Sequence, residues 1–287
     1  MHTYGLELLL WTGGYTKDDV GLIAHAKELG FDGVEIHLAN PETIPVEETK
    51  RALKDLDMKV SFAVTLTDDT NPLSPDPEVR KAAVDFFKKC IDTAYAVSGG
   101  NTFIGGVNYA SWGYFTGKAR TEQEWEWAVE NYREVARYAR DFGFVLAAEA
   151  INRFETHFLN IAKDAVQFCK DVGEPNVKVH LDTYHMIREE KDFYRAIVDT
   201  GEYLGYFHAC ENERGVPGEG LVAWEEVYQG LKDIDYHGWI TIESFVPDIE
   251  ELARVTAIWR KLAPSADALA SEGLKNIKAV DKKIFGS

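Results

Sequence analysis

The stretch that decides the fold is FVLAAEAINRFETH, residues 144–157. It begins with five apolar residues, a run of strand length, and places the carboxylate of Glu149 where that run stops. Polar side chains follow at once at Asn152, Arg153 and Glu155. Parallel barrels present catalytic groups in this way, at the carboxyl ends of their strands. For one strand alone, a charge that only marks the end of the element explains the pattern equally well.

Composition and charge limit the partners that the chain can have. Its 287 residues are 45% hydrophobic and 28% charged, which is enough for one large core or two modest ones. The formal net charge of −17 argues against nucleic acid, because binding a phosphate backbone needs a basic patch. No apolar run approaches the roughly 20 residues that span a bilayer. We therefore expect neither a nucleic-acid nor a membrane partner.

The N-terminus and the cysteines indicate a cytoplasmic protein. The opening segment, MHTYGLELLLW, lacks the basic region and the small-residue cleavage site of a signal peptide. The three cysteines, Cys90, Cys169 and Cys210, are widely spaced and form no CxxC pair. An odd number at such spacing favours reduced thiols, which are typical of the cytoplasm.

Strand-like and helix-like segments alternate along the chain. The predicted strands are Tyr4–Leu10, Gly33–Leu38, Met58–Leu66, Asn101–Gly105, Phe144–Glu149, Val177–Asp182, Leu204–His208 and Trp239–Glu243. The predicted helices are Asp18–Gly30, Pro45–Asp57, Pro77–Val97, Glu122–Phe142, Ile161–Val172, Glu189–Thr200, Trp224–Ile234 and Ile249–Leu262. Eight such units in about 260 residues favour an α/β fold, a (β/α)8 TIM barrel, over an open sheet. We expect a single domain over residues 1–287, with the barrel at about 3–262 and a C-terminal helical segment at 263–287.

Four consecutive predicted strands end in a group that can bind metal. They are Glu149, Asp182, His208 and Glu243, on the fifth to eighth strands. Neighbouring strands of a barrel bring such side chains together, and three carboxylates repel one another unless a cation lies among them. Three oxygen ligands and one imidazole suit Mn²⁺, Mg²⁺ or Co²⁺ better than a structural zinc site. Each residue alone has an ordinary structural explanation, but their shared placement predicts a divalent-metal site.

Further polar side chains follow these strand ends. Glu155, His185 and Arg214 lie on predicted loops above the metal, where they are placed to hold hydroxyls or oxyanions. Structural roles also fit each of them. Arg214 and Glu213 fit a surface pair, Glu155 fits a brace for Arg153 or a cap for the helix after it, and His185 fits an ordinary loop histidine.

A histidine and several aromatic residues belong to the same region. His180 shares a strand face with Asp182, and a satisfied core histidine is a better interpretation than a group that orients a metal ligand. The long loop after the fourth strand fits a sugar-binding wall, a cover for the barrel rim or an interface. Its aromatic residues are Tyr109, Trp112, Tyr114 and Phe115, and Trp11 and Tyr15 fit the same mouth.

Four segments resemble a known family. They are EAINRFETHFLN (149–160), HLDTYHM (180–186), HACENERGVPGEG (208–220) and IESF (242–245). They are similar to the signature segments of ketose 3-epimerases, the D-tagatose/D-allulose (psicose) 3-epimerase group within the xylose-isomerase-like TIM-barrel superfamily. The resemblance covers nearly the whole chain and is densest between Val145 and Phe245.

The resemblance implies an activity and a cofactor. It implies metal-dependent C3 epimerisation of a free ketose of the D-tagatose, D-fructose/D-allulose or L-ribulose type, through a cis-enediolate. Glu149, Asp182, His208 and Glu243 would bind the metal, Mn²⁺ first and Co²⁺ or Mg²⁺ otherwise. Glu149 and Glu243 would also be the catalytic acid–base pair. The family further implies a homodimer or homotetramer.

The resemblance also implies substrate contacts. Glu155, His185 and Arg214 would hold the O1–O3 end of the sugar, and Trp112 stands where the family has a pocket tryptophan. Two departures lie near the sugar. The run HACENERG differs from the more usual HxGEANR, and Leu221 follows GEG where a basic residue is common. The preference of the family for particular sugars therefore does not transfer directly.

Other functions fit the same fold, because fold alone does not fix the reaction. An aldose–ketose isomerase, an inosose dehydratase and a hydroxypyruvate isomerase share this chemistry. A non-catalytic sugar-binding accessory protein is a different class, but it has no need of two opposed glutamates. A barrel nuclease for abasic DNA would need more histidine ligands and a basic groove, which the charge of −17 argues against.

Overall fold

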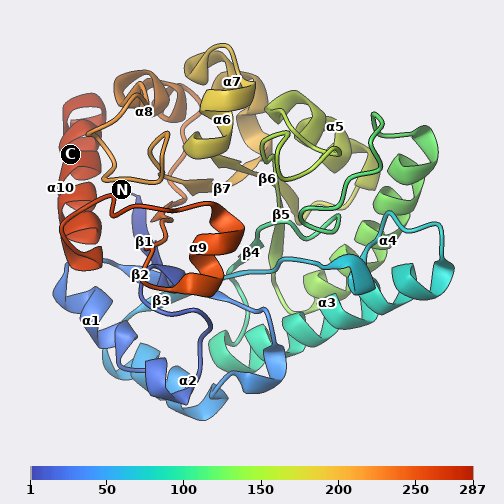
Figure 1. Ribbon diagram of the computed structural model, residues 1–287, viewed down its shortest axis with the longest axis horizontal. Coiled ribbons are helices and arrows are strands. Elements are labelled where there is room, and N and C mark those ends of the chain that lie inside the picture. Colours follow the sequence, from blue (N-terminus) through green and yellow to red (C-terminus); the bar gives the residue numbers. More distant parts are fainter. Residues whose placement is uncertain (1, 287) are drawn as a thin grey trace.

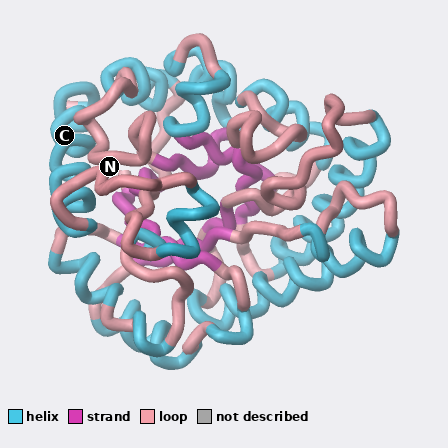
Figure 2. The backbone as a smooth tube through the Cα atoms, viewed as in Figure 1, coloured by secondary structure: helices cyan, strands magenta, loops and turns pink. Residues whose placement is uncertain are grey.

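The chain, described over residues 2–286 in a computed structural model, closes eight parallel strands into one barrel. The strands pair in sequence order, and β1 pairs with β8 to close the ring. Figure 2 shows this ring of strands in magenta, surrounded by helices. The predicted TIM barrel is confirmed. Its strands are β1 (Thr3–Glu7), β2 (Gly33–His37), β3 (Lys59–Ala63), β4 (Phe103–Gly105), β5 (Val145–Glu149), β6 (Val177–Asp182), β7 (Leu204–His208) and β8 (Trp239–Ile242).

Helices follow the strands, and local capping signals set several of their ends. Asp76 accepts a hydrogen bond from Glu78 N at the start of α3, and Gly99 ends that helix in the left-handed conformation. Thr121 and Glu124 form a capping box at the start of α4. The helices are α1 (Leu22–Glu28), α2 (Val46–Asp55), α3 (Pro77–Ser98), α4 (Glu122–Asp141), α5 (Ala162–Val172), α6 (Thr183–Glu189), α7 (Phe193–Thr200), α8 (Trp224–Asp233), α9 (Glu250–Thr256) and α10 (Ala266–Phe285). Among the described residues, no helix is long and apolar enough to cross a membrane.

A bulky indole fills part of the barrel interior. Trp239 of β8 packs with Tyr206 and Ala147 in a small buried cluster. Gly5 and Gly33 make room for it, since a Cβ on either glycine would approach the indole ring within 2.9 Å. Gly5 on β1 and Gly33 on β2 therefore leave the space that the large side chain of Trp239 on β8 fills.

Two predicted strands end three residues earlier than expected. The first, Tyr4–Leu10, is wrong beyond Glu7, because Leu8–Leu10 form the 3-10 helix η1. The third, Met58–Leu66, ends at Ala63. In both places the apolar run continues past the strand because the following residues are buried as well. A continuous apolar run marks burial and does not by itself mark the end of a strand.

Three predicted helices also differ. The helix expected at Asp18–Gly30 begins at Leu22, after the 3-10 helix η2 (Lys17–Asp19). The loop expected after β6 is helix α6, and a separate helix, α7, follows it. The helix expected at Ile249–Leu262 ends at Thr256, because Ala257 turns with φ 57° and Ile258 packs beneath.

The predicted C-terminal helix is present and packs beside α8 (Figure 1). Its anchor is Asp281, which is buried and accepts a hydrogen bond from Tyr4 Oη at 2.6 Å. His2 Nδ1 lies 3.3 Å from the same carboxylate. These contacts attach the last helix to the first strand and so stabilise the closure of the barrel.

We expect Asp281→Ala to lower the free energy of unfolding by about 1–3 kcal/mol, because the Tyr4 hydroxyl loses its buried acceptor. Urea denaturation measures the change, and Asp55→Ala on the exposed face of α2 is the matched control. Equal unfolding midpoints for the two variants would contradict this anchoring role.

Candidate active site

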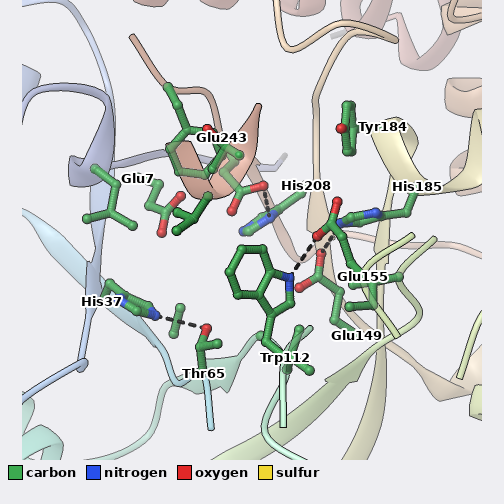
Figure 3. Close-up of a pocket in the computed structure, with 18 of the residues that line it drawn as sticks. Glu7, His37, Thr65, Trp112, Glu149, Glu155, Tyr184, His185, His208 and Glu243 are labelled. Atoms are coloured by element: carbon green, nitrogen blue, oxygen red, sulfur yellow. Dashed lines mark hydrogen bonds and ion pairs between the residues drawn. The ribbon is translucent and has the colours of Figure 1, made fainter. Parts of the chain in front are cut away.

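A pocket opens at the carboxyl ends of the strands, where the sequence places its polar groups (Figure 3). Predicted residues that line it are Glu149, Glu155, His185, His208, Arg214, Glu243 and Trp112. Asp182 is fully buried at the end of β6. Asp182 also caps α6 by accepting a hydrogen bond from Tyr184 N at 2.7 Å. The start of α6 and the position of Asp182 are therefore fixed together.

The four predicted metal ligands converge. Single ligand atoms of Asp182, His208 and Glu243 lie within 4.8 Å of one another, and so do those of Glu149, Asp182 and His185. Glu149 belongs to a further group of this kind with His180 and His208. The strand order β5 to β8 produces this convergence, because adjacent parallel strands end at the same rim.

Arg214 neutralises part of this negative charge. Its Nη1 donates to Asp182 Oδ2 at 2.9 Å and also to Glu243 Oε2. Burial raises the pKa of Glu243, but Arg214 and His208 offset this effect and hold that pKa well below its usual value. Arg214 is buried and has φ 66°, so it is not an exposed partner of Glu213.

His208 is oriented by a residue that the sequence analysis missed. Its Nε2 lies 2.7 Å from Glu35 Oε2, so the carboxylate accepts the Nε2 hydrogen and Nδ1 faces Glu243 at 3.6 Å. Burial lowers the pKa of His208, but Glu35 and Glu243 outweigh burial and raise it well above its usual value. Tyr206 Oη also donates to Glu35 Oε2, at 3.2 Å. Partners of this kind commonly orient a metal-binding imidazole.

Two buried atoms of the four predicted metal ligands have no hydrogen-bond partner within residues 2–286. They are Glu149 Oε1 and His208 Nδ1. Burial raises the pKa of Glu149 well above its usual value, and the charges of Glu243 and Asp182 raise it further. Unpaired buried polar atoms are costly. A divalent cation would give both atoms a partner, so the donor set fits the expected metal.

The wall beside β5 is a hydrogen-bonded chain. Trp112 Nε1 donates to Glu155 Oε2 at 2.9 Å, and Asn152 Nδ2 donates to Glu155 Oε1 at 2.8 Å. Asn152 N donates to His185 Nδ1 at 3.2 Å, which leaves His185 Nε2 facing Glu149 Oε1 at 3.5 Å. These bonds fix the side chains of Trp112, Glu155 and His185 toward the pocket (Figure 3).

The positions of Glu155, His185 and His180 decide between the alternative roles that the sequence left open for them. Glu155 does not brace Arg153, because Arg153 pairs with Glu189, with 2.8 Å between Nη2 and Oε2. His185 stands on helix α6 and not on a loop. His180 is fully buried, with Nδ1 3.8 Å from Glu149 Oε2, so it lies next to the cluster.

The aromatic residues divide into different roles. Trp112 lines the pocket, whereas Tyr109 is fully buried behind it and donates to the backbone oxygen of Glu149 at 2.7 Å. Phe115 is exposed, and Trp11 donates to Asp267 near the start of α10. The aromatic loop therefore contributes one wall residue, and its other aromatic side chains are not among the residues that line the pocket.

Two more polar residues of the pocket, both at strand ends, were missed. Glu7 ends β1 and His37 ends β2, and both line the pocket. Glu7 was hidden because the first predicted strand ran on to Leu10. A search for a carboxylate or imidazole inside every apolar run would have found both residues, and Glu35 with them.

Comparison with known proteins places this barrel in a family. Residues 23–279 match the family described as xylose isomerase-like TIM barrel. The match covers most of the chain, so the protein belongs to this family.

Individual relatives within this family are named as 3-epimerases of ketoses. The chain is 34% identical over 278 residues to an L-ribulose 3-epimerase of Methylomonas sp. (strain DH-1), covering 96% of each chain. It is 34% identical to a D-psicose 3-epimerase of Ruminiclostridium cellulolyticum, covering 92% of this chain and 91% of the relative. The crystal structure of a D-allulose 3-epimerase from Methylomonas sp. in complex with D-allulose has a TM-score of 0.92 and 32% identity, covering 97% and 96% of the two chains. The predicted resemblance to the ketose 3-epimerases, and with it the isomerase class, is confirmed.

The ionised form of Glu155 stabilises the fold. Burial raises its pKa, but the charges of His185 and Arg214 and the bond from Trp112 lower it below the ordinary value of 4.5. A depressed carboxyl pKa contributes stability above the ordinary pKa, and this stability is lost as the pH falls through the lowered one.

We therefore expect Glu155→Gln to lower the free energy of unfolding at pH 7 by about 1–3 kcal/mol, because bonds to a charged acceptor are lost. The difference from the unchanged protein shrinks as the pH falls below the ordinary pKa of Glu155. Urea denaturation at pH 7 and at about pH 3.5 measures this difference in the free energy of unfolding. Glu130→Gln, on the exposed face of α4, is the control. A loss of the same size at both pH values would show that the charge of Glu155 is not responsible.

Proposed function

We propose that the protein is a metal-dependent ketose 3-epimerase that acts on an unphosphorylated ketose of the D-tagatose, D-fructose/D-allulose or L-ribulose type. The observation that carries the proposal is the pair Glu149 and Glu243, which come from β5 and from the end of β8 and whose ligand atoms each lie within 4.8 Å of those of Asp182 and His208. Relatives that cover nearly the whole chain bear the names of such epimerases, which supports the same reaction.

The proposed metal ligands are Glu149, Asp182, His208 and Glu243. Their oxygen-rich donor set suits Mn²⁺ first, with Co²⁺ and Mg²⁺ as alternatives. A bound divalent ion would act as a Lewis acid toward the sugar oxygens and favour loss of the C3 proton. Glu35 fixes the ring of His208, and Arg214 limits the repulsion between Asp182 and Glu243.

The two glutamates divide the proton transfers. One removes the C3 proton, which gives a cis-enediolate, and the other delivers a proton to the opposite face of C3. The environment drives their pKa values apart, with that of Glu149 raised and that of Glu243 lowered. Such a difference supports Glu149 as the acid and Glu243 as the base in one direction, with the roles exchanged in the other.

The remaining polar side chains orient the sugar. Glu155, His185 and Arg214 are proposed to bind the O1–O3 end, and Trp112 to pack against the sugar. Arg214 is the one arginine or lysine among the pocket-lining residues within the described chain. This supports an unphosphorylated substrate. A homodimer or homotetramer in the cytoplasm stays a prediction.

Proton exchange in D₂O tests the reaction. Metal-loaded protein is incubated with D-fructose, D-tagatose and L-ribulose, and we expect deuterium at C3 together with the C3 epimer. We expect Glu149→Gln and Glu243→Gln each to reduce turnover by at least about 10²–10⁴-fold, because each variant loses one proton-transfer group.

Glu130→Gln is the matched control and should keep full turnover. Deuterium at C1 with an aldose product would make the protein an aldose–ketose isomerase. Near-normal turnover in either glutamate variant would contradict the assigned acid–base pair.

A separate prediction concerns Glu35. We expect Glu35→Gln to weaken Mn²⁺ binding by about 10- to 100-fold, because His208 loses the carboxylate that fixes its orientation. Calorimetric titration with MnCl₂ measures the affinity, and thermal unfolding of the metal-free protein checks that the variant is folded. Unchanged Mn²⁺ affinity in a folded variant would contradict the role of the Glu35 carboxylate in metal binding.

A further inference from the structure

A second cavity adjoins the catalytic pocket beside α6. Its volume is about 340 Å³. Tyr184 and Thr256 line both the catalytic pocket and this second cavity, so the two spaces share a wall. Tyr184 precedes His185 on α6, and Figure 3 shows both on the same side of the pocket as Glu155. The second cavity therefore lies next to residues proposed to bind the O1–O3 end of the ketose.

Two arginines hold the tyrosine of the shared wall in place. The guanidinium carbons of Arg188 and Arg214 lie 3.8 and 3.9 Å from the centroid of the Tyr184 ring. Contacts of this kind between a cation and an aromatic face are attractive. Arg188 also lines the second cavity, and its guanidinium donates to the backbone oxygens of Tyr184 and Asn212. Tyr184 is thus a fixed partition between the two spaces.

The residues that depart from the pattern of the ketose 3-epimerases gather at this second cavity. Asn212 and Glu213, from the run HACENERG, line it, and neither is among the residues that line the catalytic pocket. Asn212 Oδ1 accepts a hydrogen bond from Leu221 N at 2.9 Å, so the other departure is attached to the same place. The departures therefore alter the second cavity and leave the lining of the catalytic pocket as it is.

The carboxylate of Glu213 favours a hydroxyl-bearing ligand. Its Oε2 is buried and has no hydrogen-bond partner within residues 2–286. A buried acceptor without a donor costs free energy, and a hydroxyl group is a suitable donor. A phosphate would meet like charge at Glu213, and Arg188 already donates to backbone oxygens. A neutral ligand with several hydroxyl groups therefore suits this cavity better than an anion.

An exposed indole supplies the apolar surface of the same cavity. Trp259 lines it and is 71% exposed. The preceding residue, Ile258, is buried with Leu9 and Phe245, which fixes the position of the indole at the rim. Ligand sites commonly combine an aromatic surface with a few polar groups. Trp259 with Glu213 and its neighbouring amide fits the apolar face and the hydroxyl groups of one sugar ring.

We propose that the second cavity is a glycosyl subsite, which binds a sugar ring attached to O1 of the ketose. This rests on the proposed function, because binding of the O1–O3 end by Glu155, His185 and Arg214 brings O1 toward Tyr184. The substrate class is then the 1-O-glycosyl ketoses, disaccharides whose ketose unit keeps a free C3 hydroxyl. Trp259 packs against the added ring and is a specificity-determining residue.

The test compares D-fructose with two of its glucosides. Trehalulose carries the glucosyl group on O1, and isomaltulose carries it on O6, at the other end of the ketose. In the unchanged protein we expect kcat/KM for trehalulose to exceed that for D-fructose by about 10- to 100-fold, as for a few added hydrogen bonds and one aromatic contact. Isomaltulose should show no such gain, because its glucosyl group lies away from the subsite.

Variants of the subsite should change the ratio of kcat/KM between trehalulose and D-fructose. We expect Trp259→Ala to lower this ratio by about 2- to 10-fold, because the added ring loses its aromatic contact. Glu213→Ala should lower it as well, and Glu213→Gln, which keeps an oxygen acceptor, should restore part of it. Glu130→Ala on the exposed face of α4 is the control and should keep the ratio of the unchanged protein.

A ratio separates specificity from damage, because partial misfolding lowers the rates with both sugars alike. An unchanged ratio in Trp259→Ala would overturn the proposal. If that variant also had a smaller molecular mass in solution, the indole would be assigned to a contact between copies of the chain.

Binding decides the subsite even if turnover fails. Calorimetric titration of the metal-loaded protein with trehalulose, D-fructose and D-fructose 1-phosphate gives the comparison without catalysis. Absence of C3 exchange with every ketose would refute the proposed function alone. Equal dissociation constants for trehalulose and D-fructose would refute the subsite alone, and tighter binding of the 1-phosphate than of trehalulose would make the cavity an anion site instead.

Discussion

Repulsion among buried carboxylates is the constraint on which the rest of this structure depends. Glu149, Asp182 and Glu243 lie at the carboxyl ends of β5, β6 and β8, and ligand atoms of Asp182 lie within 4.8 Å of those of each of the other two. Like charges at such distances raise the pKa of at least one group unless positive charge lies among them. Arg214 supplies positive charge from the protein itself, and the unpaired atoms Glu149 Oε1 and His208 Nδ1 remain available for a cation, which His208 would bind as the neutral imidazole. The close carboxylates that destabilise the fold by repulsion are also the ligands that suit a divalent metal.

Side chains inside the barrel hold the residues of this site in place. Tyr206 Oη bonds to Ser61 and to Thr241, at 2.6 and 2.8 Å, and donates to Glu35, which in turn holds His208. Trp239 packs against Tyr206 in the layer underneath, in space that two glycines leave open. The orientation of one imidazole is thus determined by side chains of β2, β3, β7 and β8. Such supporting contacts place a site more accurately than its ligands can by themselves.

Local sequence signals predicted the helices and strands well where the hydrophobic pattern had one clear period. They predicted element ends poorly where an apolar run extended past the end of a strand. The segment that begins at Thr183 is helical because Asp182 caps it, yet the sequence presents it as polar residues after a strand. Glu7 and Glu35 were missed for a related reason, since each lies inside an apolar run that the predicted strands cover. Their importance comes from partners far away in the sequence, and local patterns carry no information about those partners.

The sequence by itself determined the alternation of strands and helices, hence the barrel, and the four residues Glu149, Asp182, His208 and Glu243 at consecutive strand ends. It could do so because strand period and strand order are local properties, and parallel strands in order must end at one rim. Only the tertiary structure decided that Arg214 turns inward between two carboxylates, that Glu35 orients His208, and that Glu7 faces the pocket from the opposite wall. These depend on closing β1 against β8, which brings together charges from distant parts of the chain.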